Sequence, residues 1–236
     1  VGLGGRLVEL EGECGSDELG QAIRELGADP LVAGIIVQQP LPKDIPLRVV
    51  LDTLDPRKDI DGIHPLNAGL LALGYEGYLP ATAHASVELL KRSGVELAGS
   101  HAVVVGRSNV IGKPAAQLLL RENATVTTCH SRTRDLPAVL READVVIVAI
   151  GRAEMVTGEM LKDGAVVVDV GINVVDDQLV GDVHFDSAAE VASAITPVPG
   201  GVGPLTNAIL LTHLMRAARD QATRQIAVGA PSVRTS

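Results

Sequence analysis

Residues 103–120 read "VVVGRSNVIGKPAAQLLL", an apolar β-branched run followed by a turn and by helix-forming residues. Such a unit binds a dinucleotide when glycines let the backbone approach a pyrophosphate, which then rests on the N-terminus of the helix. Gly106, Ser108 and Gly112 occupy the turn. Their spacing departs from G-x-G-x-x-G, because Ser108 replaces the second glycine and the last glycine comes one residue late. A plain strand-to-helix turn is the alternative interpretation.

The sequence around this stretch repeats the same order. Strand-like segments at 101–106, 124–130, 144–151, 164–171 and 192–198 are joined by helix-like segments at 113–121 and near 136–142 and by a short helical turn, and a helix-like segment at 205–219 follows the last of them. Apolar strands alternating with helices are typical of a parallel sheet covered on both faces. We therefore predict a doubly wound α/β domain.

The end of the second predicted strand indicates which dinucleotide would fit. An NAD-binding chain favours an acidic residue there, which accepts a hydrogen bond from the ribose 2′-hydroxyl. This chain has His130, Ser131 and Arg132 instead. A hydroxyl and a guanidinium suit a 2′-phosphate, so NADP is the expected cofactor. A solvated loop of small polar residues is the alternative.

The N-terminal part predicts a second α/β unit. Ser16 is a candidate N-cap for a helix that places Leu19 and Ile23 on one face. Residues 32–38, "VAGIIVQ", are expected to form a buried strand, and residues 47–54 a second helix. This part of the chain has no glycine-rich phosphate loop of its own.

Residues 55–65, "DPRKDIDGIHP", combine Asp55, Asp59 and Asp61 with Lys58. The simplest interpretation is a salt-bridged turn. The Asp-x-Asp-Gly spacing resembles the start of a calcium loop, but the remaining ligand positions and the closing glutamate are absent. Calcium binding is therefore rejected.

Two further segments stand at positions where α/β proteins bind ligands. Gln38 and Gln39 follow the predicted N-terminal strand, although a strand-end glutamine more often bonds to its own loop. Residues 196–206, "TPVPGGVGPLT", contain six Pro or Gly among eleven residues. An ordinary strand-to-helix connection explains this loop unless the rest of the chain builds a site around it.

Composition excludes several classes of protein. The chain has 236 residues, of which 46% are hydrophobic, so it can bury a large core and is expected to form two lobes. A net charge of −9 and only 1% aromatic residues argue against a nucleic-acid partner. The apolar runs are too short to span a bilayer, so no membrane association is expected.

Cysteine and histidine spacing predicts neither a disulfide framework nor a metal site. Cys14 and Cys129 lie far apart with no CxxC motif, and a reducing cytoplasm fits them best. The histidines show no ligand spacing and are expected to be structural or exposed; they include His64, His130, His184 and His213.

Taken in order, "VQQPLP", "KDIDGIHPLNAG", "VVVGRSNVIGKP", "TTCHSRT", "VVVDVGIN", "VGDVHFD" and "TPVPGGVGPLT" resemble one family closely. The chain resembles the bifunctional methylenetetrahydrofolate dehydrogenase/cyclohydrolases over about residues 1–220. The resemblance implies a Rossmann-like NADP domain at 81–203 and an N-terminal α/β substrate domain at 1–80, lacking its first segment. A C-terminal helix at 204–220 would join the substrate domain, and 221–236 would form a frayed tail.

The resemblance also implies an activity and a dimer. The family oxidises 5,10-methylenetetrahydrofolate to the methenyl form with NADP and hydrolyses the product to 10-formyltetrahydrofolate. Its members bind tetrahydrofolate derivatives, and a homodimer formed through the cofactor domain is expected.

The residue assignments come from the same resemblance. Gln38 and Asp61 match catalytic positions, and Asp61 also binds the pterin. Pro199 and Gly200 match the substrate side of the cleft. The expected cofactor contacts are Gly106, Arg107, Ser108 and Gly112 at the phosphates, Ser131 and Arg132 at the 2′-phosphate, and Ile172 and Thr206 beside the nicotinamide.

Two departures from the family pattern bear on activity. Residues 80–85 read "PATAHA" where the family has "PCTPxG". The family's Tyr-x-x-x-Lys motif, whose lysine drives the hydrolysis, is expected just before residue 1 and does not occur within the 236 residues. An NADP-binding pseudoenzyme or non-catalytic module is the alternative function.

Overall fold

The computed structural model describes residues 2–11 and 14–229. The helices are α1 (Ser16–Ala28), α2 (Arg48–Thr53), α3 (Pro65–Ala72), α4 (Ala81–Arg92), α5 (Gly112–Arg121), α6 (Leu136–Leu140), α7 (Phe185–Ala189) and α8 (Val202–Gly229), with a 3-10 turn η1 (Gly158–Met160). The strands are β1 (His101–Val105), β2 (Thr125–Cys129), β3 (Val145–Val148), β4 (Val166–Asp169), β5 (Asn173–Val175), β6 (Gln178–Val180) and β7 (Ala194–Ile195).

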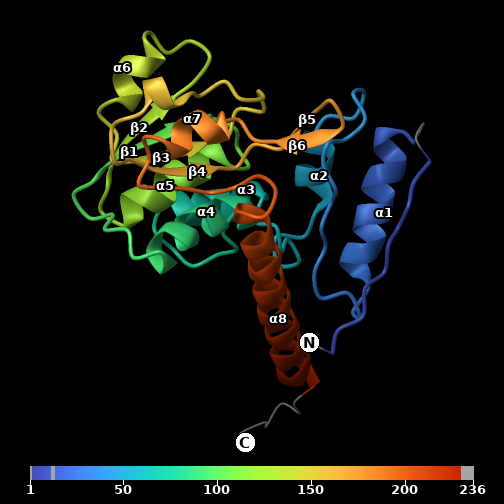
Figure 1. Ribbon diagram of the computed structural model, residues 1–236. Coiled ribbons are helices and arrows are strands. Elements are labelled where there is room, and N and C mark those ends of the chain that lie inside the picture. Colours follow the sequence, from blue (N-terminus) through green and yellow to red (C-terminus); the bar gives the residue numbers. More distant parts are fainter. Residues whose placement is uncertain (1, 12–13, 230–236) are drawn as a thin grey trace, which may run out of the picture.

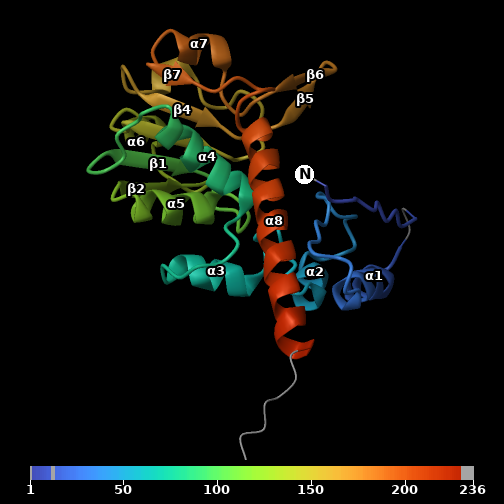
Figure 2. The ribbon, with the colours of Figure 1, turned by 90° about the horizontal axis from the view of Figure 1, so that it is seen from below.

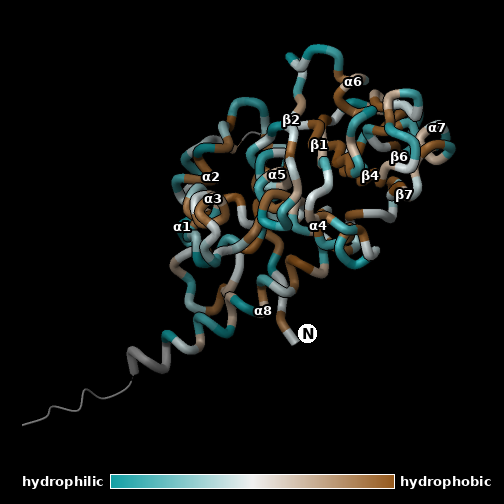
Figure 3. Tube along the Cα trace, turned by 90° about the vertical axis from the view of Figure 1, so that its left-hand side faces the viewer, coloured by the Kyte–Doolittle hydropathy of each residue, from teal (hydrophilic) through white to brown (hydrophobic). Residues whose placement is uncertain are grey.

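Five strands form one parallel sheet in the order β2-β1-β3-β4-β7. Alternate residues of β1 face opposite sides: Ala102 and Val104 pack with α4, α5 and α8, whereas Val103 and Val105 pack with α6, α7 and η1 (Figure 1). Burying each such valine stabilises the fold by about 1.5–3 kcal/mol. Figure 3 shows the hydrophobic residues along these strands and hydrophilic residues at the outer loops. The predicted doubly wound domain is confirmed.

A β-hairpin that the sequence analysis did not predict projects from this domain. Strands β5 and β6 pair antiparallel across a two-residue loop, Asp176 and Asp177. Both loop residues have positive φ, 49° and 61°. Two-residue hairpin loops in which both residues have positive φ usually contain glycine. The Asp-Asp pair adopts the conformation without the Asn-Gly or Asp-Gly sequence that would predict it.

The N-terminal part contains the predicted helices but not the predicted strand. Helix α1 buries Leu19 and Ile23, but its N-cap is Gly15, and Ser16 is its first helical residue and provides no cap. Residues 32–38 make only one parallel bridge, between Ile35 and Asp59. A strand needs a ladder of backbone partners, and the described residues supply this segment with a single bridge.

Helix α8 begins earlier and ends later than predicted. No proline or glycine interrupts residues 205–228, so nothing in the sequence stops the helix before Gly229. The predicted tail is therefore helical over 221–229, and 230–236 lies outside the described residues. Figure 2 shows α8 leaving the sheet domain and running between α3 on one side and α2 on the other. No helix among the described residues has the length and apolar composition needed to cross a membrane.

Stacked histidines pack α4 against α8. The His84 ring stacks on the His213 ring at a centroid distance of 6.2 Å, and the Tyr78 ring meets His213 edge-on at 5.4 Å. The Nδ1–H of His213 donates to the Ile60 carbonyl at 2.8 Å, whereas His84 Nδ1 is buried without a partner among the described residues. Burial lowers the pKa of both histidines.

We expect this histidine pair to make stability fall in mild acid. Below the ordinary histidine pKa, the unfolded chain takes up protons that the buried rings resist, so unfolding becomes more favourable as the pH drops from about 7.5 to about 5. Thermal unfolding across this range measures the effect. The variant His84→Gln, which cannot be protonated, should lose less stability than the parent. An equal loss in both proteins would contradict a role for His84.

Candidate active site

The turn after β1 can hold only glycine at two positions. Gly106 has φ +138°, and an added Cβ would lie 2.3 Å from the Ala149 carbonyl oxygen. A Cβ on Gly112 would lie 2.3 Å from the Gly106 carbonyl oxygen. The first turn of α5 therefore packs directly on the backbone that leaves β1. This close approach is what a pyrophosphate-binding turn requires.

Ser108 organises the same turn. Its Oγ accepts hydrogen bonds from the backbone N–H groups of Ile111 (3.0 Å) and Gly112 (3.2 Å). Because the oxygen accepts both bonds, the hydroxyl proton remains available for donation. Ser108 and Arg107 are exposed. A hydroxyl donor, a guanidinium and a helix N-terminus together fit an anionic phosphate group.

The end of β2 lies beside this turn. The Gly106 N–H donates to the Cys129 carbonyl at 2.9 Å, which joins the two strand ends. His130 Nδ1 accepts from the Arg132 N–H at 3.1 Å, and the His130 N–H donates to Thr133 Oγ1 at 2.8 Å. These bonds fix the turn and leave Ser131 and Arg132 exposed. The structure thus brings the β1 and β2 candidate residues to one edge of the sheet.

Two buried aspartates hold the neighbouring strand ends. Asp169, the last residue of β4, accepts from the N–H groups of Gly171 (2.9 Å), Asp182 (3.0 Å) and Val183 (2.8 Å). Burial raises the pKa of the Asp169 carboxyl, although these bonds oppose the rise. The Asp182 carboxylate binds the backbone that follows β3. Sequence reasoning missed both residues; the available signal for Asp169 was a carboxylate at the end of an otherwise apolar strand.

The three carboxylates of the acidic segment have different environments, and Asp59 is the structural one. Asp59 is fully buried and accepts from the N–H groups of Gly62 (3.0 Å), Ile63 (3.2 Å) and His64 (2.8 Å), and from Asn67 Nδ2 (2.7 Å). Within this segment, the one salt bridge among the described residues joins Asp55 and Arg57, at 2.6 Å. Lys58 Nζ instead donates to the Asp29 carbonyl at 2.7 Å. The predicted salt-bridged turn is therefore wrong for Asp59 and Lys58.

Asp61 and Gln38 lie within three residues of the Ile35–Asp59 bridge, which brings their two segments together. Gln38 is exposed, and Asp61 is partly buried with no hydrogen bond to its side chain among the described residues. Burial raises the pKa of the Asp61 carboxyl, and the nearby Asp59 charge adds to the increase. A partly buried carboxylate without donors is well placed to bind a ligand that brings N–H groups.

The Pro/Gly loop connects β7 to α8. Thr196 Oγ1 accepts from the Asp169 N–H at 2.8 Å, which ties the loop to β4. The Val198–Pro199 peptide is cis, and Gly200 has φ +104°. Pro199 and Gly200 are exposed. An apolar hollow of about 260 Å³ lies between this loop, the C-terminal end of α4, β4 and β7.

The remaining candidates lie on either side of the loop. Ile172 follows β4 and is 72% exposed. Thr206 lies within α8, where its hydroxyl donates to the Val202 carbonyl at 3.2 Å. No direct hydrogen bond among the described residues joins the loop to Asp61. Helix α8 connects them, because it begins at Val202 and its His213 donates to the Ile60 carbonyl beside Asp61.

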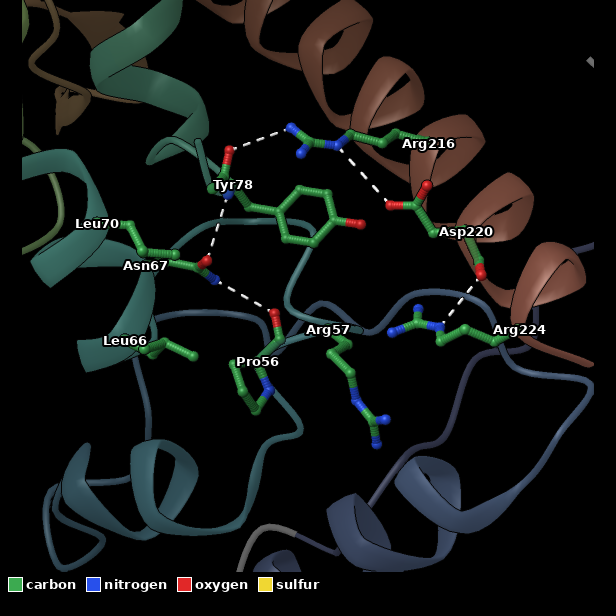
Figure 4. A pocket seen from close by; sticks show the side chains of 10 residues that line it. Pro56, Arg57, Leu66, Asn67, Leu70, Tyr78, Arg216, Asp220 and Arg224 are labelled. Carbon is green, nitrogen blue, oxygen red and sulfur yellow. Dashed lines mark hydrogen bonds and ion pairs between the residues drawn. The ribbon is translucent and has the colours of Figure 1, made fainter. Parts of the chain in front are cut away.

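A second hollow, of about 160 Å³, surrounds Tyr78 between α3 and α8 (Figure 4). The Arg216 guanidinium lies 5.4 Å from the centre of the Tyr78 ring. Asn67 accepts from the Tyr78 N–H at 3.3 Å and donates to Asp59, so the wall of this hollow shares the Asp59 network. Gln38, Asp61 and Pro199 do not line it.

Comparison with known proteins gives one consistent result. The model of the tetrahydrofolate dehydrogenase/cyclohydrolase NAD(P)-binding domain matches residues 80–222, and that of the catalytic domain matches residues 1–61. The bifunctional protein FolD of Parvibaculum lavamentivorans is 53% identical over 218 residues, which cover 89% of this chain and 73% of the relative.

Two solved structures are also similar. The bifunctional FolD enzyme from Campylobacter jejuni has a TM-score of 0.85 and 43% identity, covering 89% of this chain and 75% of its own. The Trypanosoma brucei enzyme, complexed with NADP and an inhibitor, has a TM-score of 0.85 and 39% identity, with the same coverage. Together with the domain matches, these similarities show that the chain belongs to the tetrahydrofolate dehydrogenase/cyclohydrolase family.

Proposed function

We propose that this protein oxidises 5,10-methylenetetrahydrofolate to 5,10-methenyltetrahydrofolate with NADP and hydrolyses the product to 10-formyltetrahydrofolate. The observation that carries the proposal is the glycine turn at Gly106 and Gly112, placed beside Ser131 and Arg132 in a member of this family. The relatives named as bifunctional support both activities.

The chain's own residues would bind and orient the cofactor. NADP supplies the hydride acceptor when bound. Backbone groups at Gly106 and Gly112 would lie against its pyrophosphate, and Arg107 and Ser108 would contact the phosphates. Ser131 and Arg132 would bind the 2′-phosphate, with Ile172 and Thr206 beside the nicotinamide. Catalysis of the hydride step then depends on orientation of the two reacting faces.

The substrate would bind on the other side of the cleft. Asp61 would accept hydrogen bonds from the pterin amino and ring N–H groups, which would satisfy its partly buried carboxylate. Pro199 and Gly200 would form the opposite surface mainly with backbone. In the hydrolysis, water attacks a cationic carbon, and Gln38 would position the lysine of the family's Tyr-x-x-x-Lys motif, which serves as the general acid or base.

We also propose the domain division and a homodimer. Residues 1–80 would form the substrate domain, 81–203 the NADP domain, and 204–220 the helix joining the substrate domain. The hairpin β5–β6 supports a dimer through the cofactor domain, because Val174 and Leu179 on it are 69% and 47% exposed. The cytoplasmic location stays a prediction.

NADP is expected to bind at least about tenfold more tightly than NAD, a difference of ~1.4 kcal/mol or more. Ser131 and Arg132 offer a donor and a positive charge to the 2′-phosphate, whereas NAD lacks that phosphate. Calorimetric titration with each dinucleotide measures the ratio. Ser131→Asp should weaken NADP binding and leave NAD binding equal or tighter, because an acidic residue here can accept a hydrogen bond from the ribose 2′-hydroxyl. Equal affinities for the two dinucleotides in the parent protein would disprove the assignment.

Asp61→Asn is expected to weaken binding of a folate analogue by about 10-fold to 100-fold and leave NADP binding nearly unchanged. Charge-assisted bonds contribute about 1.5–3 kcal/mol, and an amide accepts only one of the two bonds while presenting a donor to the other. Titration of both ligands tests this, with Asp55→Asn as the control because Asp55 binds Arg57. An unchanged analogue affinity would mean that Asp61 is only a turn residue.

Gln38→Ala is expected to lower cyclohydrolase activity about a hundredfold without changing NADP affinity, because the lysine of the family motif would lose the side chain that positions it. The assay follows methenyltetrahydrofolate absorbance as it forms with NADP and as it decays in water. Because the relatives are longer than this chain, it is run on the full-length natural protein. A full-length parent that binds NADP but catalyses neither step would favour the non-catalytic alternative, which the comparisons do not support.

A further inference from the structure

The Asp182 carboxylate is buried against three consecutive backbone N–H groups. The side chain is fully buried. Its Oδ2 accepts from the N–H groups of Ile150 (2.6 Å) and Gly151 (2.9 Å). Its Oδ1 accepts from the Arg152 N–H (2.8 Å) and from Asn173 Nδ2 (2.9 Å). One carboxylate thus holds the chain that leaves β3 and the first residue of β5.

The segment that Asp182 holds lies where the order of the sheet reverses. After β1 the chain forms β2 on one side, and β3 then pairs with the other side of β1. In α/β sheets, ligands bind in the crevice at this reversal, past the carboxyl ends of the strands. The Ala149 carbonyl borders the crevice, because an added Cβ on Gly106 would lie 2.3 Å from its oxygen. Ala149 therefore packs against the phosphate turn, and residues 150–152 follow it directly.

The surroundings allow Asp182 only one position. The Asp182 N–H donates to Asp169 Oδ1 at 3.0 Å. An added Cβ on Gly171 would lie 2.2 Å from Asp182 Cγ, and one on Gly181 would lie 1.8 Å from Asp169 Oδ2. Gly171 and Gly181 thus leave space for the two carboxylates. The close packing around Asp182 keeps its side chain directed at the backbone of 150–152.

We infer that Asp182 is a positioning residue for the dinucleotide. By binding the N–H groups of 150–152, it fixes the backbone wall opposite Gly106; by binding Asn173, it fixes the segment that carries Ile172. The inference rests on the proposed function for the identity of the ligand. It assigns Asp182 to cofactor binding and hydride transfer and leaves the hydrolysis, which uses no cofactor, independent of this side chain.

Asp182→Asn tests the inference. An amide has one acceptor oxygen, and its NH₂ group would face backbone donors that the carboxylate now binds. We expect the Kd for NADP, measured by calorimetry, to rise about tenfold or more. The KM for NADP should rise and dehydrogenase kcat should fall, while cyclohydrolase activity of the full-length protein stays within about twofold of the parent. Amide hydrogen exchange at 150–152 should accelerate, and saturating NADP should slow it.

Asp144→Asn is the matched control. Asp144 also accepts a backbone hydrogen bond, from the His101 N–H at 2.9 Å, but at the opposite edge of the sheet. This variant should keep the parent Kd for NADP. Asn173→Ala removes one donor from Asp182 and leaves the carboxylate in place, so it should raise the Kd for NADP by a smaller factor. If Asp182→Asn does not fold, the Kd of Asn173→Ala tests the inference in its place.

Two results would overturn the inference. One is an unchanged Kd for NADP in Asp182→Asn, or in Asn173→Ala if Asp182→Asn does not fold. The other is a parallel loss of NADP binding, both activities and thermal stability, which would indicate a purely structural residue. If the parent protein binds NADP but has neither activity, the proposed function fails, and the Kd and hydrogen-exchange comparisons still test the role of Asp182.

Discussion

Buried backbone N–H groups that lie beyond the end of a strand have no partner in the sheet and need another acceptor. This requirement determines how the segments after the strands fold in the cofactor domain and how the acidic segment folds in the N-terminal part. Parallel strands satisfy one another only along their paired lengths, so the segments that leave the sheet must find other partners. Three buried aspartates provide them. Asp59 binds the N–H groups of 62–64. Asp169 binds that of Gly171 after β4 and those of 182–183 after β6, and Asp182 binds those of 150–152.

The same requirement separates structural carboxylates from available ones. Asp59 is saturated by backbone and Asn67 donors, whereas Asp61, two residues later, has no such partner among the described residues. Gly62 makes this arrangement possible: it has φ +74°, and an added Cβ would lie 2.5 Å from the Leu79 carbonyl. The tight turn buries Asp59 and leaves Asp61 at the start of α4, where its carbonyl accepts from the Ala81 N–H at 3.0 Å.

Much of the cofactor domain could be predicted from sequence, because strands such as β1 and β3 are continuous apolar runs between helices. The hairpin β5–β6 could not, because its Asp-Asp loop lacks the usual glycine. The prediction of a strand at 32–38 was wrong, because a strand needs a second segment to pair with along its length. The hydrophobic pattern of a segment does not show whether such a partner is present. Candidate residues were found where a motif marks them, as at Gly106. Asp182 was missed because its role arises from contacts with residues about thirty positions away.

A crystal structure of the protein with NADP tests the central claim most directly. We expect the pyrophosphate to lie against the backbone of 106–112 and the 2′-phosphate to contact Ser131 and Arg132. The backbone of 150–152 should remain bound to Asp182. A dinucleotide bound away from this edge of the sheet, or a 2′-phosphate that touches neither Ser131 nor Arg132, would contradict this claim.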